Sequence, residues 1–277
     1  MLSASSNSFL TPSPPIYVDL PGVSPSSRTR TRPATHSLFE YLNPDSNSDA
    51  DGVAAILAGH KGRTIKSAAA AVERLRIVKS AAELAVMRKA ADISCAAHAE
   101  VMRLCQPTSA TAPVPVTEHV LVTQFQHACA MAGAVREAYV PVCASGKSSL
   151  SIHYTANALP LVDGDAVMLD AGCEYGGYAA DITRCFPVNG QFSGPQRDLY
   201  EAVLRVEKAC IEMCTVAHDV SLDDLHRKSV ELTRVELRDL GFNLRGGDLE
   251  RTLYPHFLSH PLGVDLHDTP TFRRNEK

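Results

Sequence analysis

The sequence predicts an α+β domain from about residue 76 onward, because helical and strand-like segments follow one another in mixed order around a central hairpin. Three observations lead to this fold class. A capping signal begins a long helix at Ser80, a β-hairpin occupies residues 167–186, and two more capped helices follow the hairpin. The 277 residues, 45% of them apolar, are enough for one large domain or two small ones with a real core.

The first 70 residues differ in character from the rest of the chain. Residues 1–50 are rich in Ser, Pro, Asn and Asp and hold few large apolar side chains. We therefore expect residues 1–70 to be poorly ordered or the remnant of an N-terminal domain, and residues 71–277 to form the folded domain. Around this boundary, the pattern favours a short buried strand over residues 52–58 and a helix over residues 66–78.

The strongest helix signal is a capping box, Ser-Ala-Ala-Glu over residues 80–83, in which each of the two polar side chains can bond the backbone of the other. The helix that it opens is expected to run to about Leu104. After a linker of Pro, Ala and Thr, residues 117–134 have a helical pattern, whereas residues 139–144 and 151–154 are strand-like.

The predicted hairpin turns at the Gly-Gly pair of residues 176–177, a dipeptide that two-residue turns of the primed types prefer. Folding the chain at this turn pairs Tyr175 with Tyr178. Counting back along both strands pairs Asp170 with Thr183.

Two later helices also carry start signals. Gly194-Pro195 opens a helix that is expected to reach about His218, with proline in its first turn. Ser221-Leu-Asp-Asp224 caps another helix, which is expected to end at Gly241. Residues 254–268 then form a histidine-rich segment.

Composition narrows the classes of partner and compartment. The net charge of −4 does not favour a nucleic acid or an anionic membrane as partner. No apolar run reaches the ~18–20 residues that a spanning helix needs. Eight scattered cysteines are typical of an intracellular protein with reduced thiols. We expect a cytoplasmic or mitochondrial protein: Arg28, Arg30 and Arg32 among serines suggest a transit peptide, whereas Asp19 and the prolines argue against an amphipathic helix there. The sequence leaves open whether it is a homo-oligomer.

A pair of aspartates on the hairpin predicts a metal site. Asp181 lies two residues from Thr183, so side-chain alternation places it on the same face as Asp170. The two are diagonal neighbours, roughly 7–8 Å apart at the backbone. Two acids that point to one place on an apolar hairpin are costly unless a cation lies between them. A solvated hairpin edge is the alternative, and the apolar run over residues 167–169 disfavours it.

Three histidines in the last segment strengthen this prediction. His256, His260 and His267 lie within twelve residues and among apolar neighbours. Helical packing at i,i+4 is the alternative for the first two, but Pro255 and Pro261 disfavour a regular helix. A mixed set of aspartate and histidine ligands favours Mn, Co, Zn or Fe over Mg or Ca.

Four segments of the chain resemble a known family in both order and spacing. They are Arg-Leu-Arg-Ile-Val-Lys-Ser (residues 74–80), Ser-Ile-His-Tyr-Thr-Ala-Asn (151–157), Gly-Tyr-Ala-Ala-Asp-Ile-Thr-Arg-Cys-Phe-Pro-Val-Asn-Gly (177–190) and His-Phe-Leu-Ser-His-Pro-Leu-Gly-Val-Asp-Leu-His-Asp (256–268). They are similar to the proline-specific branch of the pita-bread metallopeptidases, peptidase family M24. The resemblance is closest to Xaa-Pro aminopeptidases of the bacterial aminopeptidase P type and their mitochondrial relatives. Methionine aminopeptidases share the fold and rank lower.

The resemblance implies a pita-bread (creatinase/aminopeptidase-like) catalytic domain with two divalent metal ions, usually Mn²⁺, held by two aspartates, one histidine and two glutamates. Asp170 and Asp181 match the aspartates, and His260 matches the histidine ligand. Further histidines that line such a site, bind substrate and help to move protons are matched by His153, His256 and His267. Tyr178 and Arg184 are expected to serve packing and ion pairing rather than catalysis.

The reaction that the resemblance implies is hydrolysis of a peptide with a free amino terminus and proline in second position. A hydroxide that bridges two metal ions attacks the peptide carbonyl, and the ions stabilise the oxyanion, as is general for two-metal aminopeptidase sites. The protein is thus expected to be a metal-dependent aminopeptidase.

The chain departs from the family pattern in one respect that bears on activity. The two glutamate ligands are expected downstream of His267, each on a sheet strand, and Glu276 in its charged surroundings matches neither. We therefore expect a form truncated at both ends, lacking C-terminal strands and having little or no activity. The alternative from another class is a catalytically inactive pita-bread module that binds peptides or proteins. Retention of the aspartates and histidines speaks against long-standing loss of catalysis.

Overall fold

The computed structural model describes residues 16–18, 65–105 and 116–269, and the chain divides into two compact units, Met1–Leu75 and Arg76–Lys277. In the first unit, strand β1 (Ile16–Val18) pairs in parallel with β2 (Ile65–Ser67). Helix α3 (Ala69–Ile77) follows β2. The helix expected over residues 66–78 is therefore shorter, because its first residues pair as a strand. The strand expected over residues 52–58 lies outside the described residues.

Helix α4 (Ala81–Leu104) begins and ends where the sequence predicts. The capping box is confirmed: the Glu83 amide donates to Ser80 Oγ over 3.3 Å, and the Ser80 amide donates to the Glu83 carboxylate over 2.7 Å. The Tyr178 hydroxyl also donates to Glu83, over 2.7 Å. These bonds lower the pKa of Glu83 to about 2, chiefly through the backbone of Ser80. The predicted packing role of Tyr178 thus takes the form of a bond to the start of α4.

Helix α5 (Glu118–Met131) has Thr117 as its N-cap. It ends three residues earlier than predicted, before Gly133, whose φ of 92° is incompatible with a continuing helix. Two strands follow, β3 (Arg136–Glu137) and β4 (Val142–Ser145). The strand-like pattern of residues 139–144 therefore corresponds to β4, shifted toward its C-terminal end.

The strand predicted over residues 151–154 is wrong. A 3-10 helix (Gly146–Leu150) and a turn occupy this part of the chain. The reason is that side chains replace a neighbouring strand as hydrogen-bond partners of β4. Asn157 accepts from the Cys143 amide over 2.7 Å and donates to the Pro141 carbonyl over 2.8 Å.

The central hairpin is confirmed, including its register. It consists of β5 (Ala166–Asp170), β6 (Cys173–Tyr175), β7 (Tyr178–Ala179) and β8 (Thr183–Pro187). Tyr175 pairs with Tyr178 and Asp170 pairs with Thr183, as the turn predicts. Both turn glycines have positive φ, 58° and 82°, which explains the choice of residue.

The two ends of the hairpin belong to different sheets. The base joins a sheet of order β4-β5-β8, and the tip joins a sheet of order β3-β6-β7. Val167 and Leu169 of β5 are fully buried in a core shared with α4 and α5, which includes Leu121 and Phe125. The alternate residues of β5, among them Asp170, face the opposite side of the sheet.

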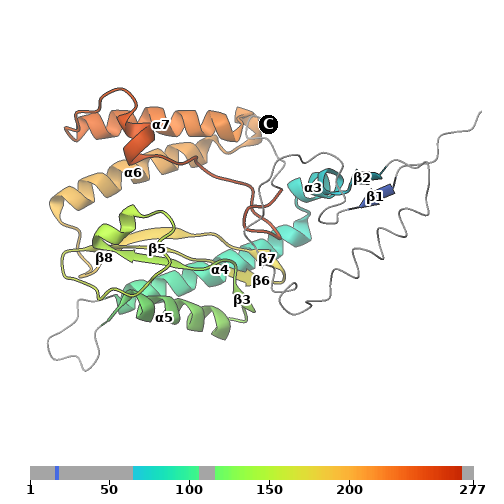
Figure 1. The fold of residues 1–277 in the computed structure, drawn as a ribbon, viewed down its shortest axis with the longest axis horizontal. Coiled ribbons are helices and arrows are strands. Elements are labelled where there is room, and N and C mark those ends of the chain that lie inside the picture. The colour runs from blue at the N-terminus through green and yellow to red at the C-terminus, as the bar shows by residue number, and fades with distance from the viewer. Residues whose placement is uncertain (1–15, 19–64, 106–115, 270–277) are drawn as a thin grey trace, which may run out of the picture. The chain divides into compact units, whose positions relative to one another are not determined.

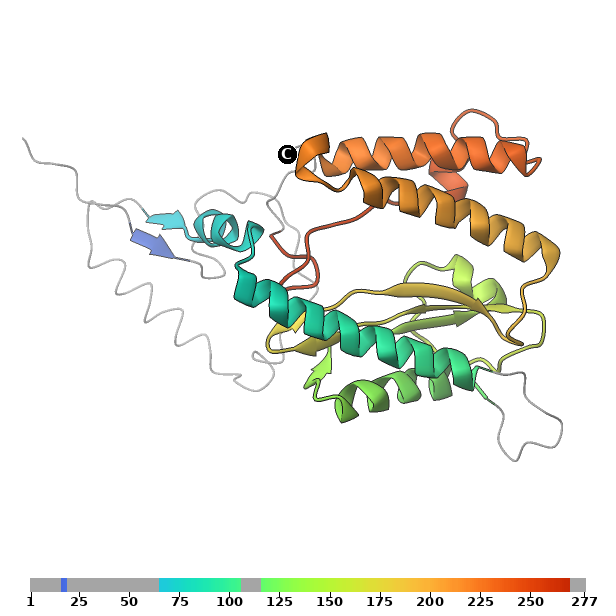
Figure 2. The same cartoon turned by 180° about the vertical axis from the view of Figure 1, so that it is seen from behind.

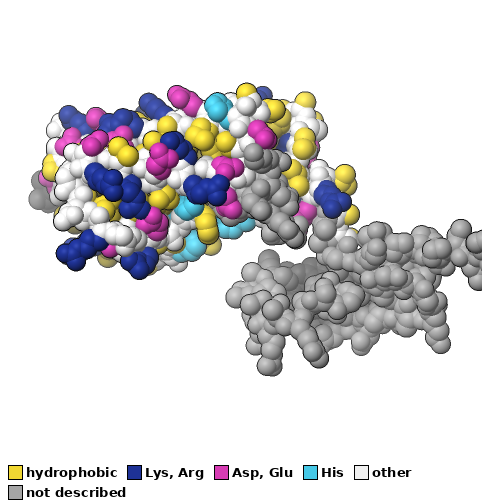
Figure 3. All heavy atoms as spheres, turned by 90° about the horizontal axis from the view of Figure 1, so that it is seen from above, with side chains coloured by type: hydrophobic (Ala, Val, Ile, Leu, Met, Phe, Trp, Pro, Cys, Tyr) yellow, Lys and Arg dark blue, Asp and Glu magenta, His cyan; other side chains and the backbone are white. Residues whose placement is uncertain are grey.

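The second unit therefore has three layers. Helices α4 and α5 cover one side of the sheets, and α6 (Gly194–Met213) and α7 (Leu222–Asp239) lie on the other (Figures 1 and 2). Ser193 and Ser221 cap α6 and α7. Both helices end before the predicted positions. Helix α6 ends at Met213, and a separate 3-10 turn (Val216–His218) follows it. On the surface that α6 and α7 form, basic and acidic side chains are interspersed (Figure 3).

Residues 254–269 follow a short π-helical turn (Leu249–Leu253) and have no regular secondary structure. This segment returns from α7 toward the tip of the hairpin (Figure 1). Within the described residues, no helix combines the length and the apolar character that crossing a membrane requires.

Candidate metal centre

Asp170 and Asp181 meet at one hydroxyl group. The side chain of Tyr139, which comes from the segment between β3 and β4, lies 2.5 Å from Asp170 Oδ1 and 3.1 Å from Asp181 Oδ1. The register of the hairpin explains why both aspartates face the same side. Asp170 pairs with Thr183, and Asp181 lies two residues before Thr183 on the same strand path, so side-chain alternation places it on the face of Asp170. The expected convergence of the two carboxylates is therefore present, with a phenol as their common partner.

The surroundings shift the pKa values of the two aspartates in opposite directions. Burial raises the pKa of Asp170, and the charge of Asp181 adds to this against the opposing effect of the Tyr139 hydrogen bond. The pKa of Asp181 is lowered, mainly by its hydrogen bond with His260. Burial and the nearby carboxylates raise the pKa of Tyr139, so its hydroxyl stays protonated as a donor. The ionised form of Asp181 is therefore stabilised by its present partners, whereas a nearby cation would stabilise the ionised form of Asp170.

His260 completes a line of polar contacts. Its Nε2 lies 3.0 Å from Asp181 Oδ2, and its Nδ1 lies 2.9 Å from the carbonyl oxygen of Pro261. A carbonyl only accepts, so Nδ1 donates in that bond, and the ionised Asp181 likewise only accepts, so Nε2 is the donor toward the aspartate. The ring of His267 lies against that of His260, with centroids 4.4 Å apart. The structure therefore brings together Asp170, Asp181, His260 and His267.

His153 and His256 lie apart from this group. His153 is exposed in the turn that follows the 3-10 helix. His256 is also exposed, and its ring packs edge-on against Tyr254 with centroids 4.8 Å apart. Within the described residues, neither histidine contacts Asp170 or Asp181.

A buried histidine lies directly behind the centre. His98 of α4 is 2% exposed, and its Nε2 donates to the carbonyl oxygen of Ala171, the residue after Asp170, over 3.0 Å. Burial lowers the pKa of His98, which keeps the ring neutral. Sequence reasoning missed both His98 and Tyr139, because each lies on an element that folding alone brings to the hairpin.

The donor atoms fit a divalent transition metal in type but not in number. Carboxylate oxygen and imidazole nitrogen suit Mn, Co, Zn or Fe. The three side chains are joined in pairs, Asp170 to Asp181 through Tyr139 and Asp181 to His260 directly. Over residues 65–105 and 116–269, no group of three or more His, Cys, Asp or Glu side chains is arranged to hold a metal ion.

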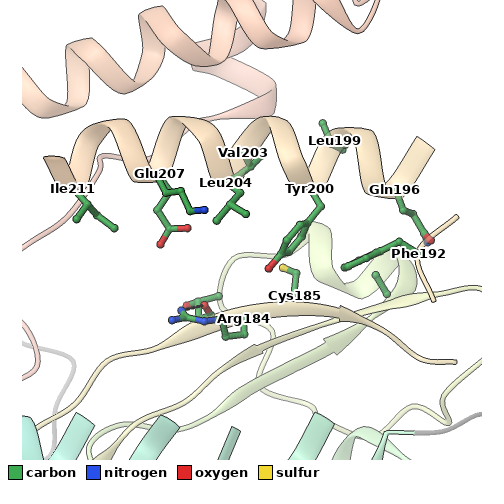
Figure 4. Close-up of a pocket in the computed structure, with 13 residues that line it drawn as sticks. Arg184, Cys185, Phe192, Gln196, Leu199, Tyr200, Val203, Leu204, Glu207 and Ile211 are labelled. Carbon is green, nitrogen blue, oxygen red and sulfur yellow. Dashed lines mark hydrogen bonds between the residues drawn. The ribbon is translucent and has the colours of Figure 1, made fainter. Parts of the chain in front are cut away.

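A cavity of about 560 Å³ begins beside the centre, between α6 and β8 (Figure 4). Thr183, the strand partner of Asp170, is part of its lining. From α6, Tyr200 and Leu204 extend toward the sheet, and Phe192 packs on Tyr200 with ring centroids 4.9 Å apart. The lining is mostly apolar, with Arg184, Glu207 and Lys208 as its charged members. Among the described residues, Arg184 has no partner for the expected ion pair and instead donates to the Thr183 carbonyl over 2.8 Å.

Tyr139→Phe is expected to destabilise the metal-free protein by about 1–2 kcal/mol, since two half-buried carboxylates lose their donor. Urea denaturation in the presence of a chelator measures the effect. Tyr175→Phe is the matched control, because the Tyr175 ring packs on the core and its hydroxyl has no partner among the described residues. Equal stability of the two variants would contradict a role for the Tyr139 hydroxyl.

Comparison with known proteins places these features in a family. The family model of "Metallopeptidase family M24" matches residues 85–277. Intermediate cleaving peptidase 55 of Schizosaccharomyces pombe is 41% identical over 197 residues, which is 71% of this chain and 39% of that protein. Xaa-Pro aminopeptidase 3 of Homo sapiens is 38% identical over 209 residues, covering 74% of this chain and 39% of that protein. The chain thus spans about two fifths of the length of these curated relatives.

Solved structures agree with this. Icp55 from Saccharomyces cerevisiae, bound to the inhibitor apstatin, superposes with a TM-score of 0.73 at 36% identity, over 83% of this chain and 54% of that one. Zn-substituted aminopeptidase P from E. coli gives a TM-score of 0.66 at 34% identity, over 74% of this chain and 46% of that one. The similarity covers both the sequence and the three-dimensional arrangement.

Proposed function

The chain belongs to metallopeptidase family M24, an enzyme family with the pita-bread fold, and from this premise we propose that it derives from a metal-dependent aminopeptidase that removes the residue preceding proline. The observation that carries the proposal is the row of contacts that joins Asp170, Asp181 and His260 through Tyr139 and directly. The names of its relatives, Xaa-Pro aminopeptidase among them, support peptides with proline in second position as substrates.

Asp170, Asp181 and His260 would hold the metal ions, for which we propose Mn²⁺. When bound, such ions polarise the peptide carbonyl and lower the pKa of a coordinated water. Asp181 is already ionised by its bond with His260, and Tyr139 holds the Asp170 carboxylate in place.

The remaining histidines would act on the substrate side. His267 is exposed beside His260, where it can exchange a proton with a bound peptide. We propose substrate contacts for the exposed side chains of His153 and His256, which would reach the peptide away from the aspartates. The intracellular location, cytoplasmic or mitochondrial, stays a prediction.

We further propose that the donors that the described residues bring together bind metal weakly and support little turnover. Two divalent ions bring four positive charges, and Asp170 and Asp181 offset two of them. With His260 as the third donor, most coordination positions would be left to water. Removal of even a supporting partner typically lowers metal affinity or activity by about 10–100-fold, so two ions that share three donors are expected to bind weakly.

Titration of the metal-free chain with Mn²⁺ in a calorimeter tests the site. Binding of Mn²⁺ is expected to be weak and to disappear in Asp181→Asn. This substitution removes the negative charge of the side chain that lies between Tyr139 and His260. Asp163→Asn is the matched control, since Asp163 is exposed in the turn before β5 and bonds only Asn189 among the described residues. Equal loss in both variants, or unchanged binding in Asp181→Asn, would contradict the assignment.

Turnover of an Xaa-Pro peptide, compared with the same peptide carrying alanine in second position, tests the activity. Substantial turnover that Asp181→Asn abolishes would support the peptidase and contradict the low activity of this chain. Peptide binding without metal binding would instead favour a binding module.

A further inference from the structure

The loop that carries His260 and His267 is a closed turn. The Asp268 amide donates to the Pro261 carbonyl over 3.1 Å, and the Gly263 amide donates to the Asp265 carbonyl over 3.1 Å. The Ala179 amide of β7 donates to the Gly263 carbonyl over 2.9 Å, which joins the loop to the edge of the hairpin. The two histidines stand at the two ends of this turn, which is why their rings meet.

Asp268 fastens the same loop to Arg76, near the end of α3, and to Lys79, just before α4. Its side chain is 1% exposed and accepts from Lys79 Nζ over 2.9 Å, and Arg76 also donates to it. Arg76 donates in addition to Asp265, over 2.5 Å. Burial opposes the charge of Asp268, but Lys79 and Arg76 together lower its pKa, so it is an ion held by two cations. A buried charge of this kind is costly unless its partners are in place.

The backbone of the loop is shaped to admit this cluster. A methyl group on Gly263 would lie 2.8 Å from Cγ of Asp268 and 3.0 Å from Cε of Lys79. A residue with a side chain at position 263 would therefore displace the ion pair. Only a bare backbone lets the carboxylate and the ammonium group approach so closely.

The cluster reaches His260 through a single carbonyl group. The Pro261 carbonyl accepts from the Asp268 amide and from Nδ1 of His260. The second hydrogen bond of a ligand histidine fixes both the orientation of its ring and the nitrogen that is left to bind the metal. A displaced Asp268 would therefore release the group that orients the imidazole.

We propose that Asp268, held by Lys79 and Arg76, is a positioning residue for His260: it fixes the Pro261 carbonyl that directs Nε2 of His260 toward Asp181. The part of this inference that concerns metal binding rests on the proposed function. The part that concerns the geometry of the imidazole does not.

The test uses the full chain and two readouts. Imidazole ¹⁵N–¹H spectra of the metal-free protein, assigned with His260→Ala, report the proton on Nδ1. Asp268→Asn is expected to shift the His260 signals toward those of exposed histidines such as His153. In the same variant, Mn²⁺ affinity is expected to fall about 10-fold or more. In the His260→Ala background, Asp268→Asn should cause no further loss of affinity, because its effect passes through that ring.

Asp265→Asn is the matched control: it removes the same charge from the same loop and also contacts Arg76, but its side chain is 61% exposed. Unchanged His260 signals in a folded Asp268→Asn variant, or an equal change in Asp265→Asn, would overturn the proposal. If Asp268→Asn does not fold, Lys79→Met takes its place, with a smaller shift of the same signals expected and an unchanged spectrum as the contrary result. A shifted His260 spectrum in a protein that never binds Mn²⁺ would refute the proposed function and leave the positioning role standing.

Discussion

Replacing Glu118 with alanine is expected to lower the free energy of unfolding by about 3–5 kcal/mol, among the largest effects of any single substitution in this chain. Glu118 lies at the first position of α5 and is fully buried. One carboxylate oxygen accepts from the amide and the hydroxyl of Ser145, each over 2.7 Å. The other accepts from the Tyr154 hydroxyl and the Leu159 amide, each over 2.9 Å. Alanine would leave the two Ser145 donors without an acceptor in a buried site and would also remove the acceptor of Tyr154 and Leu159, which are less buried.

Urea denaturation followed by circular dichroism measures the loss. Glu118→Gln keeps the size of the side chain and loses one acceptor oxygen, so an intermediate loss is expected. Glu100→Ala is the control, because Glu100 is exposed on α4 and bonds only Gln124 among the described residues. A loss in Glu118→Ala no larger than that in Glu100→Ala would show that the buried carboxylate does not hold the segment from Ser145 to Leu159.

Local rules were enough for the hairpin and for the helix starts. The register of the hairpin follows from one Gly-Gly turn, since every pair is fixed by counting from it. The capping boxes at Ser80 and Ser221 depend on residues three apart and could be read from the sequence in the same way. The shared face of Asp170 and Asp181 is a consequence of the register, so this half of the candidate site was predictable.

The remaining features depend on residues that only the tertiary fold brings together. Asn157 replaces a neighbouring strand as the partner of β4, and Glu118 binds Tyr154 and Leu159 in the chain after it, so residues 151–154 are not the strand that their pattern suggested. Tyr139 and His98 reach the hairpin from other elements. Asp268 meets Lys79 across 189 residues of sequence. The spacing of residues along the sequence does not predict contacts between distant segments, so these contacts are visible only in the structure.

Gly172→Ala is expected to destabilise the protein by about 3 kcal/mol or more and to weaken metal binding at the same time, because the substitution acts on the hairpin between the two aspartates. Gly172 lies opposite Asp181 in the register. A methyl group at this position would lie 2.5 Å from the carbonyl carbon of Ala180, closer still to its oxygen, and 3.1 Å from the amide nitrogen of Asp181. The obstacle is backbone on the opposite strand, which cannot rotate away as a side chain could.

Relief of this clash would require the two strands to separate where the Ala180 amide bonds the Cys173 carbonyl and the Ala171 amide bonds the Ile182 carbonyl, over 2.9 and 3.0 Å. Such a separation would move Asp181 away from Tyr139. Thermal denaturation and Mn²⁺ titration measure the two consequences. Gly194→Ala serves as the control, since a methyl group there meets no atom within 4 Å and the position opens helix α6. If Gly172→Ala were as stable as Gly194→Ala, the close approach of the two strands would not be a requirement of the fold. If it lost stability but bound Mn²⁺ normally, the placement of Asp181 would not depend on the hairpin.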